Sequence, residues 1–405
     1  MRHPALRAMA IPAMAALGLA FLQPAAAQER VRIGVLNDQS GPYADASGPG
    51  SVIAAQLAAE EFHAAHPSIP VEILSADHAN KADVASAIAR RWLEVEHVDA
   101  VADIQNSAIA LAVQNIANQD GKVSLATGAV SPELSGKSCS PTGVHWSMDA
   151  YSLATGPVRA LADKKRWFFM TVDLAGGHLF ESEGRAAVAA AGGEVVGSVR
   201  HPLGTTDMSS YLLQAQAAGA NVIALANAGA DTINSIKGAN EFGLVGRGIS
   251  IAPLLMFEPD IKAVGLPLAQ GMVISTSFYW DLNDESRAFA KRFAERFHRM
   301  PTQYQASTYA IVRHYLASVA AVKSVDGPKV IAAMRATPAY YFSDHLAQIR
   351  PDGRTIYDVY VMQVKKPEES KGEWDLLRLV QTVPGALAFR PAEQSQCPLM
   401  KKPAL

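Results

Sequence analysis

The chain has 405 residues, of which 49% are hydrophobic and 18% are charged, and its formal net charge at pH 7 is −2. One hydrophobic core usually stops growing at about 250–300 residues, so a chain of this length is expected to form two domains. The small and mixed charge excludes the strongly basic surface that a nucleic acid or an anionic membrane would require, and we expect neither partner.

The first 27 residues have the pattern of a secretory signal peptide. Two arginines precede an apolar run over residues 8–22, and three alanines at residues 25–27 provide a small-residue cleavage site. The run is roughly 15 residues long and contains Pro12, whereas a membrane-spanning helix needs about 20 residues. We therefore expect residues 1–27 to be removed on export and the rest of the chain not to insert into a membrane.

Cys139 and Cys397 are the two cysteines of the sequence. In an exported chain an even number of cysteines most often forms structural disulfides, so we expect these two to be bonded. The alternative is a reactive thiol, which would need a nearby cation, and Lys137 alone is close in sequence.

From Val31 onward, short β-rich runs alternate with longer helical patterns, which is typical of a doubly wound parallel sheet. Strands are expected at residues 31–36, 71–74, 100–103 and 123–125, and helices at 51–65, 81–96 and 107–119. A helix at 151–164 then leads to a second stretch with the same alternation. Its strands are expected at residues 167–172, 194–199, 222–226 and 249–252, and its helices at 177–191, 208–219 and 231–242.

The pattern changes after a strand at residues 272–276. Helices are expected at 284–299, 303–322 and 328–335, followed by strands at 357–364 and 373–380. We expect this tail to complete both lobes of an α/β fold made of two doubly wound parallel-sheet lobes. The first lobe would comprise residues 28–147 and 277–340, and the second residues 148–276 and 341–405. Three crossings near residues 147, 277 and 340 would form a hinge that closes on a ligand.

Open parallel sheets bind ligands at the carboxyl ends of their strands, so the loops there hold the candidate residues. Asn106 or Ser107 is expected to cap the helix at 107–119, whose free N–H groups could hold a carboxylate. Gly128 could add an N–H donor, because no side chain blocks its backbone. The alternative for Ser107 is an ordinary helix cap without a ligand. The candidates in the first lobe are Tyr43, Asn106, Ser107, Gly128, Ala129 and Val130.

The second lobe offers carboxylates and aromatic side chains in the corresponding loops. Asp173, Asp231 or Glu258 could pair with a ligand ammonium group, and aromatic residues could form the walls of a site. The alternatives are a helix cap for Asp231, a solvated side chain for Glu258 and a core position for Trp280. The candidates here are Tyr151, Asn227, Asp231, Phe257, Glu258 and Trp280.

Catalytic signatures are missing from the sequence. It contains no G-x-S-x-G, H-E-x-x-H, P-loop, G-x-G-x-x-G or C-x-x-C motif. His63 and His66 have no acidic or cysteine partner nearby in sequence, so we interpret them as exposed helix residues and expect no metal and no cofactor. A hydrolase with a dispersed Ser, His and Asp triad stays an alternative.

With these residues in place, the chain resembles the leucine/isoleucine/valine-binding protein family, the type I periplasmic solute-binding proteins of ABC importers. The resemblance covers essentially all of residues 28–405. It is carried by VRIGVLNDQSGPYADASGPG, DIQNSAIALAVQNIA, SPELSG, HPLGTTDMSSYLLQAQAAGANVIALANAGADTINSIKGANEFGL and TSFYWDLNDESRAFAKRF in this order. It implies the type I periplasmic binding protein fold.

The resemblance also implies roles for particular residues. Ser107 would contact a ligand carboxylate with its hydroxyl and backbone N–H, the loop Gly128–Val130 would join it, and Tyr151 would approach from the second lobe. Members that bind amino acids usually place a hydroxyl residue near the second of these loops to receive the ammonium group, and this chain has Val130 there. The fragments CSP and NAGADT resemble a subgroup whose importers also serve aromatic and other organic acids.

By this resemblance, the protein is not an enzyme. It would capture a small carboxylate-bearing solute, either a branched-chain amino acid or an aromatic or other organic acid, between its lobes. It would deliver that solute to an inner-membrane ABC permease, and we expect a monomer in the periplasm. The alternatives from other classes are a ligand-sensing module of the same fold, for a chemoreceptor or regulator, and a secreted hydrolase.

Overall fold

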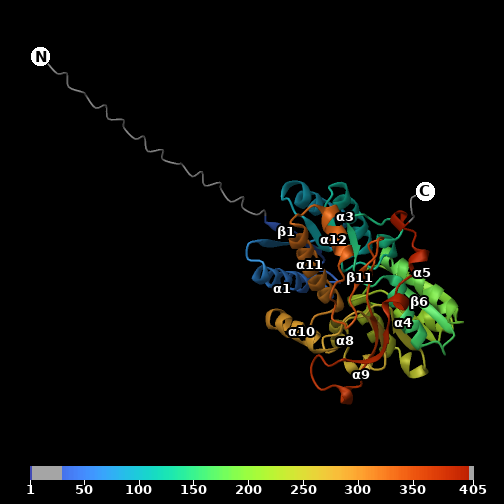
Figure 1. The fold of residues 1–405 in the computed structure, drawn as a ribbon. Coiled ribbons are helices and arrows are strands. Elements are labelled where there is room, and N and C mark those ends of the chain that lie inside the picture. The colour runs from blue at the N-terminus through green and yellow to red at the C-terminus, as the bar shows by residue number, and fades with distance from the viewer. Residues whose placement is uncertain (2–29, 401–405) are drawn as a thin grey trace.

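The computed structural model describes Met1 and residues 30–400 (Figure 1). The expected signal peptide, apart from Met1, lies outside the described residues. Within the part of the chain that is described, no helix combines the length and the apolar character needed to cross a membrane.

A five-stranded parallel sheet with the order β2-β1-β3-β4-β5 forms the centre of the first lobe. Alternate residues of β3 face two different hydrophobic clusters: Ala100 and Ala102 pack in the cluster that contains α1, and Val101 packs in the cluster that contains α2 and α3. The sheet is therefore covered on both faces, which explains why β3 and β4 are buried throughout. The elements are β1 (Val31–Asn37), α1 (Gly48–Ala65), β2 (Val71–Asp77), α2 (Ala82–Arg90), β3 (Ala100–Asp103), α3 (Ser107–Gln119), β4 (Val123–Ala126) and β5 (Gly143–His145).

A four-stranded parallel sheet with the order β7-β6-β8-β9 forms the second lobe. All five consecutive residues of β8 are buried, as expected for an inner strand between two helical layers. The elements are α4 (Ala150–Ala160), β6 (Arg166–Val172), α5 (Ala175–Ala190), β7 (Glu194–His201), α6 (Ser209–Ala217), β8 (Val222–Ala226), α7 (Ala230–Glu241), β9 (Ser250–Pro253), α8 (Glu258–Val264) and α9 (Leu266–Ala269).

The helices that follow return to the first lobe. These are α10 (Asp284–Phe297), α11 (Gln303–Val322) and α12 (Gly327–Ala336), and Figure 1 shows α11 beside α1. Arg292 and Arg296 of α10 form ion pairs with Glu61 and Glu60 of α1. The Thr302 hydroxyl donates to the Ala46 carbonyl at 2.6 Å, which places the start of α11 against the loop after β1.

A third, antiparallel sheet lies against the second lobe. It has the order β10-β13-β14, from β10 (Val273–Thr276), β13 (Val359–Val364) and β14 (Leu377–Val383). A Cβ on Gly156 of α4 would lie 2.1 Å from the Ser275 hydroxyl of β10, so helix and strand approach as closely as a glycine permits.

The short hairpin of β11 (Gln348–Ile349) and β12 (Thr355–Ile356) extends the first lobe instead. Arg354 forms a β-bridge with His145 of β5, and the His145 N–H donates to the Gly353 carbonyl at 2.8 Å. We expected the third crossing near residue 340. Because residues 348–356 lie beside β5, we propose that this crossing occurs between Ile356 and Val359.

The three crossings meet in a buried cluster. The Tyr357 hydroxyl of the third crossing donates to the Trp146 carbonyl of the first at 2.5 Å. The Tyr341 hydroxyl lies 2.8 Å from the Ser277 hydroxyl of the second. The rings of Trp146 and Tyr341 pack edge to face at 5.5 Å. Movement of one crossing therefore requires adjustment of the others.

The sequence-based elements are largely confirmed, and the exceptions are short. The helix predicted at 81–96 is α2 followed by a π-helical turn at Arg91–Val95, and the last predicted strand lies at 377–383. The sequence analysis missed β5, β11, β12, α8, α9 and α13 (Gly385–Ala388). Segments of two to seven residues are too short to show a periodic pattern.

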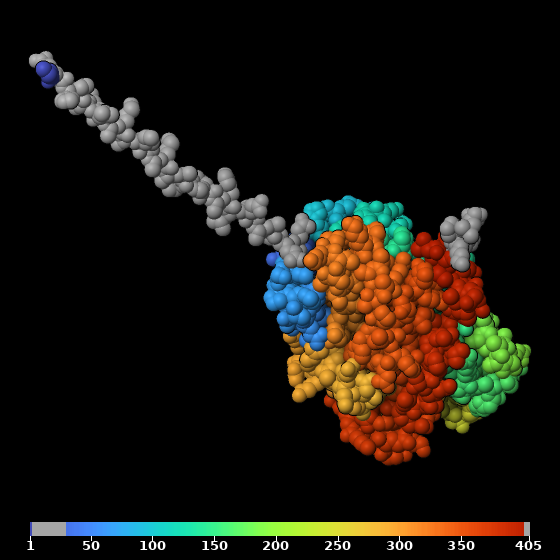
Figure 2. All heavy atoms as spheres, viewed as in Figure 1, coloured from blue at the N-terminus to red at the C-terminus, as the bar shows by residue number. Residues whose placement is uncertain are grey.

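The C-terminal segment runs back along the molecule to the first lobe. In the face shown in Figure 2, the red C-terminal residues form a continuous band beside the green middle of the chain. A disulfide joins Cys397 to Cys139, with their Cα atoms 5.6 Å apart, which confirms the predicted bond. Cys139 lies between β4 and β5, so the bond fixes the segment after α13 to the first sheet.

We expect the double variant Cys139→Ser, Cys397→Ser to unfold at a lower temperature than the oxidised wild type, by roughly 2–5 kcal/mol in free energy, because its unfolded chain has lost a covalent constraint. Calorimetric unfolding measures this. The wild type in reducing agent should melt like the variant. Two free thiols in the denatured, unreduced wild type would contradict the bond.

Candidate functional site

A pocket lies where the loops of the two parallel sheets meet, and it encloses a cavity of about 60 Å³. Its position at the carboxyl ends of the strands agrees with the rule for open parallel sheets. The first lobe contributes Tyr43, Ala46, Gln105, Asn106, Ser107, Gly128, Val130 and Tyr304. The second contributes Val172, Leu174, Gly176, Gly177, Phe180, Asn227, Ala228, Leu255 and Phe257.

The loop between β3 and α3 is held in an unusual backbone conformation. Asp103, Ile104 and Asn106 have φ angles of 70°, 51° and 78°, in the left-handed region that a β-branched residue such as Ile104 rarely adopts. Such strain persists only where the surroundings enforce it, and it is common at binding sites. In this loop the strained conformation points the N-terminus of α3 toward the pocket.

The buried carboxylate of Asp103 enforces this conformation. It accepts hydrogen bonds from the Asn37 amide at 2.7 Å and the Thr127 hydroxyl at 3.1 Å. The Asp103 carbonyl accepts from the N–H groups of Thr127 and Gly128. Burial raises the pKa of Asp103, while the hydrogen bonds from the Asn37 and Thr127 side chains act in the opposite direction. One residue thus ties together the ends of β1, β3 and β4.

The N-terminus of α3 presents a free hydroxyl to the pocket. Asn106 is the cap, since its side-chain oxygen accepts from the Ala108 N–H at 3.1 Å. Ser107 is therefore not needed as a cap. Its hydroxyl is buried and has no hydrogen-bond partner among the described residues. Leaving such a group unpaired is costly, which favours a ligand partner.

The N-terminus of α5 faces α3 from the second lobe. Its first residue follows Leu174, which provides no capping side chain, so the first N–H groups of the helix stay available. A Cβ on Gly176 would lie 3.4 Å from the Ser107 hydroxyl and 3.5 Å from Val130. The two helix ends therefore lie within van der Waals reach of each other at this position.

The two lobes also touch at other points around the pocket. Gly229 has a φ of 59°, and a Cβ there would lie 2.4 Å from the Pro42 carbonyl of the first lobe. The rings of Phe257 and Tyr304 pack edge to face at 4.9 Å. The pocket is thus closed by contacts that both lobes supply.

The residues that line the pocket include no Asp, Glu, Lys or Arg. Two helix N-termini carry partial positive charge into it, and the walls are mainly aliphatic and aromatic. This combination favours a solute with one anionic group and an apolar body.

Seven of the predicted site residues line the pocket, namely Tyr43, Asn106, Ser107, Gly128, Val130, Asn227 and Phe257. Ala129 lies in the same loop, but its carbonyl accepts hydrogen bonds from His145 and Ser147 behind the loop. Tyr151 lies outside the lining because its ring packs under the guanidinium of Arg390, 4.7 Å away. Trp280 lies outside it because its indole N–H donates to the Trp374 carbonyl at 2.8 Å.

Neither Asp231 nor Glu258 belongs to the lining. Asp231 is buried in α7, where its carboxylate accepts from the Gly204 N–H at 3.3 Å, and burial raises its pKa. Glu258 begins α8 and is also buried, which raises its pKa from 4.5 to about 8. Asp173 is exposed and pairs with His178. The structure therefore places these three carboxylates outside the lining of the pocket.

Sequence reasoning missed several residues of the lining. Gln105 and Tyr304 each have a buried side-chain oxygen without a partner among the described residues. Gln105 lies in a loop that the sequence analysis considered, whereas Tyr304 is far from all of these loops in sequence. No pattern in the sequence connects α11 with the pocket. The apolar wall of Val172, Leu174 and Phe180 was also missed, although it lies close to the candidate Asp173 in sequence.

Known proteins of similar sequence identify the family of this chain. A family model described as periplasmic binding protein matches residues 30–373. A relative from Brucella melitensis, named Leu/Ile/Val-binding protein homolog 6, is 28% identical over 287 residues, which cover 69% of this chain and 72% of the relative.

Solved structures show the same fold at higher identity. A periplasmic binding protein from Burkholderia mallei is 41% identical with a TM-score of 0.88, over 92% of this chain and 99% of that one. A branched chain amino acid ABC transporter periplasmic ligand-binding protein from Burkholderia xenovorans is 40% identical with a TM-score of 0.81, over 92% and 100% of the two chains. The chain therefore belongs to the periplasmic binding protein family and is a solute-binding protein rather than an enzyme.

Proposed function

We propose that this protein captures a small carboxylate that has an apolar body and no ammonium group, in the periplasm, and delivers it to an ABC import permease in the inner membrane. The observation that carries the proposal is the uncharged pocket at two converging helix N-termini. Residues 1–27 would direct export, and the monomer would present the closed complex to the permease.

The carboxylate would lie between α3 and α5. The Ser107 hydroxyl is a donor there that has no partner in the part of the chain that the structure describes, and hydrogen bonds to a charged acceptor are stronger than those between neutral groups. The N–H groups at the start of α5 and the partial charge of both helices would add to its stabilisation. No full positive charge is needed for this.

The body of the solute would lie against the aromatic side chains. Phe180 and Phe257 come from the second lobe, and Tyr43 and Tyr304 from the first. Because both lobes contact the solute, it binds the closed state better than the open one, and this difference in affinity drives closure.

We propose the lobe boundaries of the sequence analysis with one change: the third crossing lies at residues 356–359 instead of near residue 340.

An ammonium group would find no charged partner in this pocket. At pH 7 Glu258 is mainly protonated, since its pKa is about 8, and it lies outside the lining. Asp231 also lies outside the lining, where one of its oxygens accepts a backbone hydrogen bond and the other has no partner among the described residues. The acceptors in the lining, such as the Gln105 side-chain oxygen, are neutral. These features favour aromatic and other organic acids over branched-chain amino acids.

We expect ligand-free protein to bind 4-methylpentanoate more tightly than L-leucine, which differs by the added amine, and benzoate more tightly than benzamide, which lacks the charge. Titration calorimetry measures all four affinities. Tighter binding of L-leucine would show that an ammonium site exists and would contradict the proposed solute class. Preference for benzamide would contradict the carboxylate site.

Ser107→Ala should weaken the binding of the preferred carboxylate by roughly 1–3 kcal/mol, about 5- to 150-fold in Kd, because a charge-assisted hydrogen bond is lost. The matched control is Ser124→Ala, which removes another buried and unpaired hydroxyl, in β4 and outside the lining. An equal loss of affinity in both variants would show that Ser107 makes no specific contact with the carboxylate.

Glu258→Gln should raise the melting temperature at pH 8.5 and change it little at pH 5. The pKa of Glu258 is about 8 in the folded protein against 4.5 ordinarily, so its contribution to stability is lost as the pH rises from 4.5 through 8. Because the entropy of unfolding grows with chain length, a gain of about 1 kcal/mol corresponds to roughly 1 °C in a chain of 405 residues. The exposed Glu393, changed to Gln, is the control, and equal pH profiles for wild type and Glu258→Gln would contradict the prediction.

A further inference from the structure

The loop after β4, residues 127–131, is held from behind by the first crossing. The Ala129 carbonyl accepts from the His145 Nε2 at 3.0 Å and from the Ser147 hydroxyl at 2.6 Å. The Ala150 N–H donates to the Val130 carbonyl at 2.9 Å. Gly128 and Val130 of this loop line the pocket. The crossing therefore determines how the loop faces a solute.

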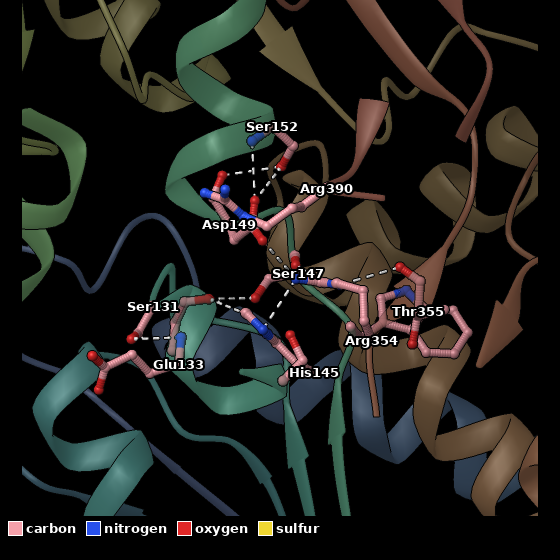
Figure 3. Close-up of polar contacts among 12 residues, drawn as sticks. Ser131, Glu133, His145, Ser147, Asp149, Ser152, Arg354, Thr355 and Arg390 are labelled. Carbon is pink, nitrogen blue, oxygen red and sulfur yellow. Dashed lines mark hydrogen bonds and ion pairs between the residues drawn. The ribbon is translucent and has the colours of Figure 1, made fainter. Parts of the chain in front are cut away.

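Arg354 in turn holds the crossing, as Figure 3 shows. Its guanidinium is buried, with 1% of the residue exposed. It contacts the Nδ1 of His145 at 3.0 Å and donates to the Ser147 carbonyl. The carboxylate of Asp149 lies 3.6 Å away. His145, Ser147 and Asp149 of the first crossing thus all contact the guanidinium of Arg354.

The chemistry of arginine fixes the state of His145. A guanidinium has donors only, so Nδ1 must accept from it, and the proton of the imidazole must lie on Nε2, where it is donated to Ala129. Burial, and then the positive charge of Arg354, hold the pKa of His145 well below its usual value. His145 is therefore a neutral link with a fixed direction from Arg354 to the loop.

Burying the charges of Arg354 and Asp149 costs free energy, because both groups leave water. Asp149 is 2% exposed, and its other oxygen accepts from the Ser152 N–H at the start of α4. The ring of Phe389 covers the guanidinium at 4.9 Å. Replacing a buried ion pair by apolar residues is often neutral or stabilising, so its presence here is consistent with a positional role.

We propose that Arg354 is a positioning residue of the solute site, acting through His145 and Ser147 on the peptide groups of residues 128–130. This inference rests on the proposed function. Arg354 precedes the third crossing and Asp149 belongs to the first, so the same contacts connect the hinge with the pocket. A change in hinge angle and a change in the loop are then mechanically coupled.

Hydrogen exchange measured on the protein without solute tests the positioning. The reporters are the amides of Thr127 and Gly128, which donate to Asp103, and of Ala150, which donates to Val130. We expect Arg354→Met and His145→Leu to speed their exchange about tenfold, because the hydrogen bonds that hold the Ala129 carbonyl are weakened or lost. His145→Gln should restore slow exchange, because an amide can accept from Arg354 and donate to Ala129.

The matched control is His314→Leu. His314 is another buried histidine that contacts a backbone carbonyl, that of Met334, but it lies in α11 away from this loop. We expect His314→Leu to leave the exchange rates of the three reporter amides unchanged. If His145→Gln exchanges as fast as His145→Leu, or if His145→Leu exchanges as slowly as wild type, the inference is wrong. The His145 variants decide this even if Arg354→Met fails to fold.

Benzoate titration separates positioning from a general loss of stability. At a temperature where all variants are folded, His145→Leu should bind benzoate about tenfold more weakly than wild type, and His145→Gln nearly as well. A lower melting temperature with unchanged affinity would overturn the inference. If wild type itself fails to bind benzoate, the proposed solute class is at fault, and the exchange data still judge the role of Arg354.

Discussion

The buried carboxylate of Asp103 is the contact on which the solute site depends. It holds Asn37 at the end of β1 and Thr127 at the end of β4, while its own backbone leaves β3 with a positive φ. The Asn37 amide also donates to the Gly48 carbonyl of α1, and the Thr127 hydroxyl lies 2.8 Å from that of Thr308 in α11. Without this network the strained turn that directs α3 at the pocket would have nothing to offset its cost.

A second constraint is the small distance between the two helix ends. Partial charges of helix termini act over about one turn, so α3 and α5 can share an anion only if their first residues nearly touch. Gly176 marks the closest approach, since a Cβ there would lie in van der Waals contact with Ser107 and Val130. In the proposed mode of binding, an anion would therefore be held only by the closed molecule, which would link binding to closure without any charged side chain in the lining.

The sequence predicted the parts of the site that local patterns control. The helix at 107–119 and the strand at 100–103 have the predicted bounds, because a cap, a buried strand and an apolar face are all encoded within about twenty residues. Loops at strand ends could be placed for the same reason, and the disulfide followed from two cysteines in an exported chain.

The rest depends on partners distant in sequence. Tyr151 and Trp280 resemble wall residues in isolation, but Arg390 and the Trp374 carbonyl take them away from the pocket. Tyr304 enters the lining only because α11 packs beside α1. The antiparallel third sheet pairs β10 with β13 across more than eighty residues, and the pairing leaves no periodic trace in either strand. The disulfide has a further consequence, since Cys139 and Cys397 are 258 residues apart and the whole second sheet lies between them. The second lobe is thus part of a covalent ring that closes on the first, and a single proteolytic cut between the cysteines would leave both lobes in one molecule.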